Sequence, residues 1–265
     1  MSTRKDPARD SPECAAIQLG GVVHRYPDGV EALRGVDLEI RVGERVALAG
    51  PNGSGKSTLL RQLNGLLTPT AGRVTIFGRP VSAKNLTHIR RQVGYVFQEA
   101  DDQLFCPTVL EDVAFGPLHL GLPVEEVLGC VREALELVGL SQFEQRVPQK
   151  LSAGEKSLVA LASVLSYGAD LLALDEPSAA LDPRNRRRLI GILTRLPQTQ
   201  LIATHDLDLA WELCPRTVLL DRGRVVADGP TRDLLADRAL LEQHGLELPL
   251  MLQGQTNPVT ARPEV

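Results

Sequence analysis

Two patterns of apolar and polar residues along this chain predict strands. Residues 36–42 alternate strictly between apolar and charged side chains, which is typical of a strand with one buried face. Residues 170–177 and 200–205 contain uninterrupted apolar runs, which are typical of strands buried on both faces of a parallel sheet. Other strands, including a hairpin that turns at Arg222-Gly223, are predicted at residues 17–25, 45–49, 73–77, 93–97 and 217–226.

Helical patterns lie between these strands. Leu59, Leu60 and Leu63 recur at helical spacing, and Asn64-Gly65 is a favourable helix end. Residues 99–166 are mostly helical in pattern, and the stretch 123–138 has a clear apolar face. A last helix is predicted over residues 231–243. The sequence therefore indicates an α/β core with a helical insertion at about residues 99–166.

The two ends of the chain differ from the rest in composition. Residues 1–14 are charged and contain prolines, so we expect a disordered N-terminal tail. Residues 251–265 are expected to be a loose C-terminal tail. The residues between them, 15–250, are long enough for one large domain that contains a subdomain.

Composition and charge narrow the classes of function. The net charge is −4 and aromatic residues make up 3%, so neither a basic surface nor stacking platforms for nucleic acid are expected. The four cysteines are scattered without a Cys-x-x-Cys pair, which favours reduced thiols over disulfides or a zinc site. No signal peptide and no membrane-spanning segment is predicted.

A glycine-rich loop with the pattern Gly-x-x-x-x-Gly-Lys-Ser follows the predicted strand at residues 45–49. Glycines let successive backbone N–H groups converge on an anion, and the N-terminus of the following helix adds partial positive charge. Lys56 can reach the β- and γ-phosphates of a nucleotide, and Ser57 can offer its hydroxyl to Mg²⁺. The predicted phosphate site consists of Gly50, Pro51, Asn52, Gly53, Ser54, Gly55, Lys56, Ser57 and Thr58.

Polar side chains end two of the buried strands. Asp175 and Glu176 follow one apolar run, and His205 follows another. Open α/β sheets bind ligands at the carboxyl ends of their strands. Because Mg²⁺ takes one or two protein carboxylates, Asp175 is predicted to bind it beside Ser57. Glu176 is then free to face an attacking water, and His205 is a candidate for contact with the γ-phosphate.

In this order and spacing, the motifs resemble those of the ATP-binding cassette (ABC) ATPases of ABC transporters, over roughly residues 15–250. Gln98 is similar to the glutamine of the family's Q-loop, and residues 151–155 to its signature segment. Residues 171–176 resemble the Walker B strand with its catalytic glutamate, and residues 178–182 the D-loop. His205 resembles the switch histidine, and Tyr26 the aromatic residue that stacks on adenine.

The resemblance implies a P-loop NTPase fold with a mostly parallel sheet, an antiparallel β subdomain and a helical subdomain. It implies ATP hydrolysis with Mg²⁺, and no nucleic-acid partner. Implied catalytic residues are Glu176, His205, Gln98 and Lys56, and implied magnesium ligands are Ser57, Gln98 and Asp175. The signature residues Ser152, Ala153, Gly154 and Glu155 would act in trans on the nucleotide of a second ATPase subunit, and Asp182 would couple the two sites.

A finer resemblance concerns residues 97–105, 108–117 and 240–249. These segments are similar to the energy-coupling factor ATPases, which power uptake of cobalt, nickel or vitamins. The resemblance implies an integral membrane subunit as partner and a peripheral position at the cytoplasmic face of the membrane. The transported solute is not encoded in this chain.

Two other functions remain open at this point. A soluble mechanical ATPase of DNA repair or translation has the same cassette, but such chains generally carry long coiled coils or tandem cassettes. A nucleotide kinase shares the glycine-rich loop, but it gives no reason for the signature segment or for His205. Pull-down of a hydrophobic partner and phosphoryl transfer to a nucleoside monophosphate are the respective tests.

The signature segment departs from the usual Leu-Ser-Gly-Gly-Gln of the family at Ala153 and Glu155. If position 153 needed a positive φ, alanine there would cost on the order of 1 kcal/mol. Glu155 would place a negative charge near a triphosphate. Either both changes are silent, or the signature is weak and the chain turns over slowly or pairs with a second ATPase.

Overall fold

The central sheet of the computed structural model has six strands in the order β10-β9-β3-β8-β7-β6, and the structure describes residues 15–253. Five of these strands run parallel to one another: β9 (Arg216–Asp221), β3 (Arg45–Ala49), β8 (Thr199–Thr204), β7 (Leu171–Asp175) and β6 (Val93–Val96). β10 (Arg224–Pro230) is antiparallel to β9, which confirms the predicted hairpin. Every residue of β7 and β8 is buried, as their apolar runs predict.

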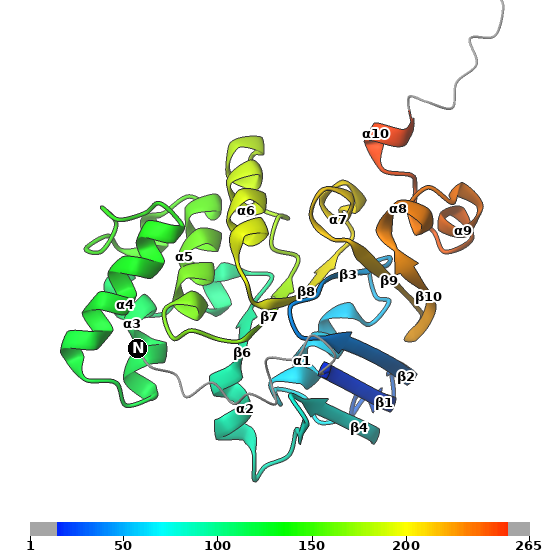
Figure 1. Cartoon of the computed structure of the whole chain (residues 1–265), viewed down its shortest axis with the longest axis horizontal. Helices are drawn as coiled ribbons and strands as arrows, with labels where there is room; N and C mark the ends of the chain where they lie inside the picture. The colour runs from blue at the N-terminus through cyan, green and yellow to red at the C-terminus, as the bar shows by residue number, and fades with distance from the viewer. Residues whose placement is uncertain (1–14, 254–265) are drawn as a thin grey trace, which may run out of the picture.

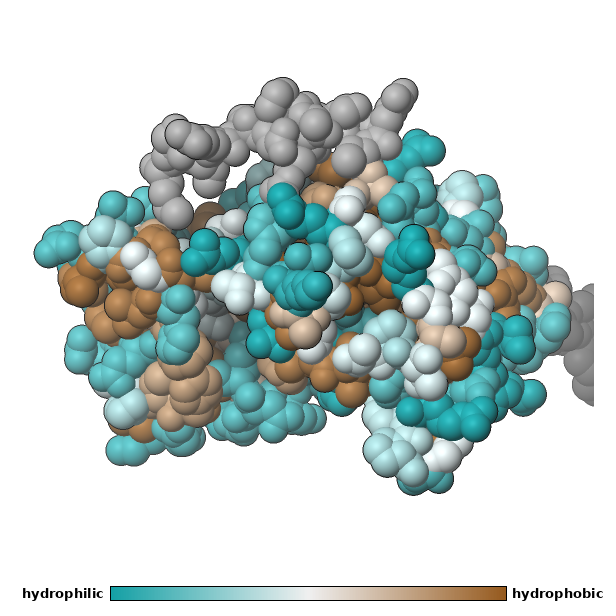
Figure 2. Space-filling model, turned by 90° about the horizontal axis from the view of Figure 1, so that it is seen from below, coloured by the Kyte–Doolittle hydropathy of each residue, from teal (hydrophilic) through white to brown (hydrophobic). Residues whose placement is uncertain are grey.

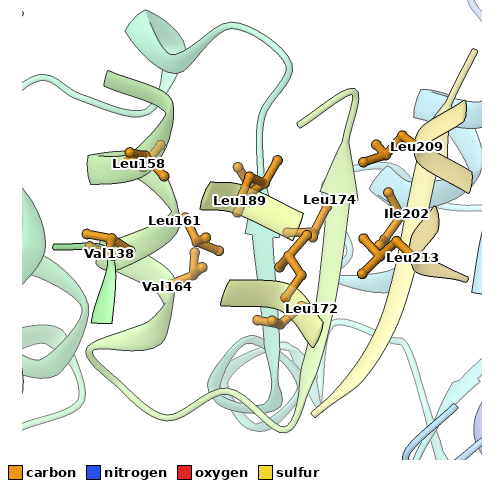
Figure 3. Packing of buried hydrophobic residues seen from close by; sticks show 14 of the residues in the cluster. Val138, Leu158, Leu161, Val164, Leu172, Leu174, Leu189, Ile202, Leu209 and Leu213 are labelled. Carbon is orange, nitrogen blue, oxygen red and sulfur yellow. The ribbon is translucent and has the colours of Figure 1, made fainter. Parts of the chain in front are cut away.

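The two faces of this sheet belong to two separate hydrophobic clusters. Leu172 and Leu174 pack with residues of the helices α5 (Ala153–Leu165), α6 (Pro183–Arg195) and α7 (Leu207–Leu213) (Figure 3). Leu171 and Ala173 instead share a cluster with α1 (Lys56–Leu63). Successive side chains of a strand point to opposite faces, so an apolar residue is needed at every position of β7. The sheet is therefore covered on both sides.

A second, antiparallel sheet shares a hydrophobic cluster with α1, and its strands are ordered β2-β1-β4-β5. Its members are β1 (Ala15–Arg25), β2 (Glu31–Arg41), β4 (Ala71–Ile76) and β5 (Arg79–Pro80). β2 alternates between buried and exposed residues at its C-terminal end, as predicted for residues 36–42. It begins earlier, at Glu31, where it pairs with Arg25 of β1. Figure 1 shows this sheet at the lower right, below β3, β9 and β10 of the central sheet.

The predicted helical subdomain is present on the left of Figure 1, next to β6. It contains the short 3₁₀ helices η1 (Ala100–Asp102) and η2 (Pro148–Lys150) and the helices α3 (Val109–His119), α4 (Val124–Leu137) and α5. Thr108 caps α3 by accepting a hydrogen bond from the N–H of Glu111. A further helix, α2 (Leu86–Gln92), precedes β6 and was not predicted.

The C-terminal part differs from the prediction in two places. The single helix expected over residues 231–243 is wrong, because the chain forms α8 (Thr231–Leu234) and α9 (Arg238–Gln243). Asp237 separates these two helices, because its carboxylate accepts from the N–H of Leu240 and caps α9. Residues 251–253, expected in a loose tail, belong to α10 (Leu250–Gln253). The tails expected at 1–14 and 254–265 lie outside the described residues.

The architecture confirms the expected fold class, an α/β core with antiparallel and helical subdomains. Within residues 15–253, no helix is both long and apolar enough to cross a membrane.

Candidate functional site

The glycine-rich loop connects β3 to α1, as predicted, and its glycines are required by the backbone. Gly55 precedes the first turn of α1 at a φ of 109°, in the region that L side chains rarely adopt. A Cβ at Gly55 would lie 2.6 Å from the carbonyl oxygen of Ala32, and one at Gly50 would collide with the carbonyl oxygen of Leu220. The loop therefore packs too closely against neighbouring backbone to accept side chains at these positions.

Lys56 is the first residue of α1 and is only 6% exposed. Its Nζ donates to the carbonyl oxygens of Gly50 at 2.8 Å and Pro51 at 3.1 Å, and lies 3.7 Å from Oε1 of Glu176. Burial lowers the pKa of Lys56, and the negative charges of Glu176 and Asp175 oppose that shift. The loop thus holds an ammonium group beside the carboxylate of Glu176, the residue that directly follows β7.

Asp175 and Ser57 meet although 118 positions separate them in the sequence. The Ser57 hydroxyl donates to Asp175 Oδ1 at 2.9 Å, and the Tyr95 hydroxyl donates to Asp175 Oδ2 at 3.0 Å. Burial raises the pKa of Asp175, and these two hydrogen bonds oppose the rise. A hydroxyl and a carboxylate oxygen at one point are the hard donors that Mg²⁺ prefers, so this pair fits the ion.

Glu176 points away from Asp175, because its backbone turns out of the strand at a φ of 47°. Such a conformation costs a residue other than glycine roughly 1–2 kcal/mol, and it is held here by a hydrogen bond from the N–H of Glu176 to the Ala203 carbonyl. The carboxylate is 2.9 Å from Nδ1 of His205 and accepts from the Thr204 hydroxyl at 3.3 Å. The two adjacent carboxylates therefore face different partners.

Lys56, Glu176 and His205 line one pocket of about 390 Å³, a size in the range of small-molecule sites. Tyr26 stands at its edge, where its hydroxyl forms a hydrogen bond of 2.9 Å with that of Thr58. His205 is about half exposed to the pocket, and Gln98 is exposed at its rim. The lining residues are Tyr26, Val30, Ala32, Asn52, Gly53, Gly55, Lys56, Ser57, Thr58, Gln98, Glu176 and His205.

The signature residues are not part of this pocket; among residues 15–253, its lining contains none of 151–155. Ser152 caps α5 by accepting from the N–H of Glu155 at 3.3 Å. In return, Glu155 Oε2 accepts from the N–H and from the hydroxyl of Ser152, each at 2.8 Å. These contacts form a capping box, a role that glutamate and glutamine both perform.

The strain considered for Ala153 is absent. Ala153 is the first helical residue of α5 and does not have a positive φ. Asp182 also caps a helix, because its Oδ1 accepts from the N–H groups of Arg184 and Asn185 at the start of α6. Its other oxygen accepts from the Asn185 amide, whose nitrogen would lie 2.7 Å from a Cβ at Gly154. The signature segment and the D-loop are therefore packed together in one subunit.

Sequence reasoning missed two residues that hold the site together, Tyr95 and Thr204. Both are buried and polar at strand positions, at 5% and 0% exposure. A tyrosine within a buried strand needs a partner for its hydroxyl, and that rule could have directed attention to the nearby Asp175. Thr204 directly precedes His205, so its place at the strand end was readable from the same apolar run.

Comparison with known proteins gives one matching family model, described as ABC transporter, over residues 33–179. A protein of Gloeobacter violaceus, named provisionally as an ABC transporter ATP-binding protein, is 61% identical, with 86% of this chain and 95% of that protein covered. The energy-coupling factor transporter ATP-binding protein EcfA of Methanothermobacter thermautotrophicus is 46% identical, with 88% and 76% covered. The structure of cbiO1 from Clostridium perfringens, part of the ABC transporter complex cbiONQ, matches with a TM-score of 0.78 and 34% identity, covering 92% of this chain and 99% of that one.

Proposed function

Because this chain belongs to the ABC transporter ATP-binding family, we propose that it is the ATPase subunit of an energy-coupling factor importer. The chain is an ABC ATPase, so hydrolysis of ATP is its activity. The proposal adds the type of importer and a solute among cobalt, nickel and vitamins. Similarity to EcfA and to cbiO1 supports the importer type, while the solute depends on membrane subunits that this chain does not contain.

The observation that carries the mechanism is the meeting of Lys56, Glu176 and His205 in one pocket from three separate elements. Lys56 supplies positive charge at the phosphate loop, Glu176 a buried carboxylate, and His205 a ring that contacts this carboxylate. Such a set combines anion binding with a base, which is the requirement for attack by water on a phosphoryl group.

ATP is proposed to bind with its phosphates along residues 50–58 and its adenine on Tyr26. The backbone N–H groups of the loop and the N-terminus of α1 face the phosphate oxygens, and Lys56 reaches the β- and γ-phosphates. Ser57 and Asp175 would hold Mg²⁺, with Gln98 at the rim of the same pocket. When bound, Mg²⁺ supplies positive charge that offsets the charge on the phosphates.

Hydrolysis is proposed to proceed by in-line attack of water on the γ-phosphorus. Glu176 orients the water and accepts its proton, a bond forms from the water oxygen to phosphorus, and the bond to the bridging oxygen breaks to give ADP and phosphate. His205 holds Glu176 and contacts the γ-phosphate. Lys56 stabilises the negative charge on the transferred group.

A second ATPase subunit is proposed to complete the site. Ser152 and Gly154, at the start of α5, would face the nucleotide of the partner, and the partner's signature segment would face this pocket. Asp182, which packs beside the signature segment through Asn185, is placed to transmit the state of one site to the other.

The helical subdomain is proposed as the contact with the membrane subunit. Phe105 and Phe115 are 62% and 40% exposed and pack edge to face at 4.9 Å between ring centroids. Leu118 of α3 is also exposed. Figure 2 shows apolar residues gathered on the left, the side on which the helical subdomain lies in Figure 1. Through this contact, the ATPase chain is proposed to lie peripherally at the cytoplasmic face of the membrane.

The importer proposal is tested by expressing the chain with candidate membrane subunits and measuring uptake of labelled cobalt, nickel and vitamins. We expect co-purification with a membrane subunit and uptake of one of these solutes. The matched control is Glu176→Gln, which should assemble normally but abolish uptake. ATPase activity with neither a membrane partner nor uptake would contradict the proposal and favour a soluble mechanical ATPase. Phosphoryl transfer to a nucleoside monophosphate would favour a kinase.

The altered signature leads to a separate prediction. Glu155→Gln keeps the capping box but removes a negative charge near the partner's nucleotide, so ATP turnover should rise a few fold at low salt and less at high salt. Glu155→Ala keeps Ser152 as the cap but removes the glutamate half of the capping box, and it should lower the free energy of unfolding by about 0.5–1.5 kcal/mol. Phosphate release at several salt concentrations and thermal unfolding are the two measurements.

Ala153→Gly is the matched control, because Ala153 is unstrained and glycine relieves nothing there. Its turnover should not increase. If Glu155→Gln turns over at the wild-type rate at every salt concentration, the departure at Glu155 has no functional weight and the weak-signature hypothesis is abandoned.

A further inference from the structure

Tyr95 is a buried tyrosine of β6 whose hydroxyl has no task in the mechanism above. The residue is 5% exposed, and its ring packs edge to face against Phe97 with 4.7 Å between centroids. The hydroxyl donates to Asp175 Oδ2 at 3.0 Å. A single phenolic hydroxyl thus reaches the carboxylate at the end of β7 from the neighbouring strand.

The direction of this hydrogen bond is fixed by its two partners. The oxygens of an ionised carboxylate can only accept, whereas a phenol can donate its hydrogen. The phenolic hydrogen is therefore donated to Asp175.

The two oxygens of Asp175 consequently have different partners. Oδ2 accepts from Tyr95 and Oδ1 from Ser57, and the residue as a whole is 1% exposed. A carboxylate with one oxygen bound in this way cannot rotate freely about its last torsion. Hydrogen bonds to the distal side of a metal ligand typically change metal affinity about 10- to 100-fold.

We propose that Tyr95 is a positioning residue of the magnesium site, which holds Asp175 Oδ2 so that Oδ1 stays directed at Ser57 and the cation. The inference rests on the assignment of Ser57 and Asp175 as magnesium ligands in the proposed function. It concerns the orientation of the ligand, and Tyr95 itself contacts neither the nucleotide nor the cation.

The variant Tyr95→Phe removes the hydroxyl and keeps the ring. With Mn²⁺ as the probe, electron paramagnetic resonance of the ADP complex should show metal affinity reduced about 10- to 100-fold. The Mg²⁺ concentration that half-saturates ATP turnover should rise, while kcat at saturating Mg²⁺ and the affinity for ATP in EDTA stay near the wild-type values. Far-ultraviolet circular dichroism and Tm establish that the variant is folded.

Tyr167→Phe is the matched control. Its hydroxyl donates to the carbonyl of Val93 at 3.4 Å and not to Asp175, so its loss should leave metal affinity unchanged. Metal affinity that is unchanged or higher in folded Tyr95→Phe, or an equal loss in Tyr167→Phe, overturns the proposal. Asp175→Asn separates the two assignments: wild-type metal affinity in this variant refutes the ligand assignment, whereas a loss confined to it refutes only the role of Tyr95.

Discussion

Glu176→Gln should hydrolyse ATP about 10²–10⁴ times more slowly than the wild-type chain, with ATP affinity little changed. Glutamine keeps the shape of the side chain and an oxygen that can accept from Thr204 and His205, so the pocket is preserved. It lacks the negative charge and the basicity needed to take a proton from water. The change also removes the negative charge beside the buried Lys56 ammonium, so thermal unfolding without nucleotide must show that the variant is folded.

The slow variant should accumulate as an ATP-bound dimer, because the proposed pairing of two subunits around the nucleotide requires ATP to be bound and not cleaved. Phosphate release measures turnover, and size-exclusion chromatography with ATP and Mg²⁺ measures the dimer. Glu136→Gln, an exposed position on α4, is the control and should behave as wild type. Near-normal turnover in folded Glu176→Gln would show that another group is the catalytic carboxylate.

Lys56→Ala should weaken ATP binding by roughly 10- to 150-fold. A hydrogen bond to a charged group contributes about 1.5–3 kcal/mol, and 1.4 kcal/mol corresponds to a factor of ten in affinity. The ammonium donates to the carbonyl oxygens of Gly50 and Pro51 in the phosphate loop, where the oxygens of a bound phosphate can replace those carbonyls as its partners. Alanine removes this charge but leaves the loop, whose shape depends on its glycines.

Isothermal titration with ATP and Mg²⁺ measures the loss. Lys150→Ala removes an exposed lysine outside the pocket and should bind ATP as the wild type does. Because Lys56 lies beside Glu176, thermal unfolding without nucleotide must show that the variant is folded. Unchanged ATP affinity in a folded variant would contradict the assignment of residues 50–58 as the phosphate-binding loop.

Some of this site is local, and those parts were predicted from sequence. The strand, loop and helix around residues 45–63 follow one another in the chain, and the glycine pattern requires the backbone conformation that Gly55 adopts. The hairpin at Arg222-Gly223 and the buried run of β7 are equally local. Prediction was less successful where a residue could lie inside a helix or cap a new one. Asp237 caps α9, and residues 231–243 are therefore not one helix.

The sequence by itself determined which residue types are available for phosphate, cation and water, because a phosphate loop and a buried strand have patterns that a few neighbouring residues specify. Only the tertiary structure decided how these residues pair. The sheet order puts β7 between β6 and β8, which brings Tyr95 to Asp175 across 80 positions and His205 to Glu176 across 29. It also showed that the Glu155 carboxylate is bound to Ser152 and that Ala153 is unstrained. Such contacts depend on strand neighbours and backbone dihedrals, which no pattern along the chain records.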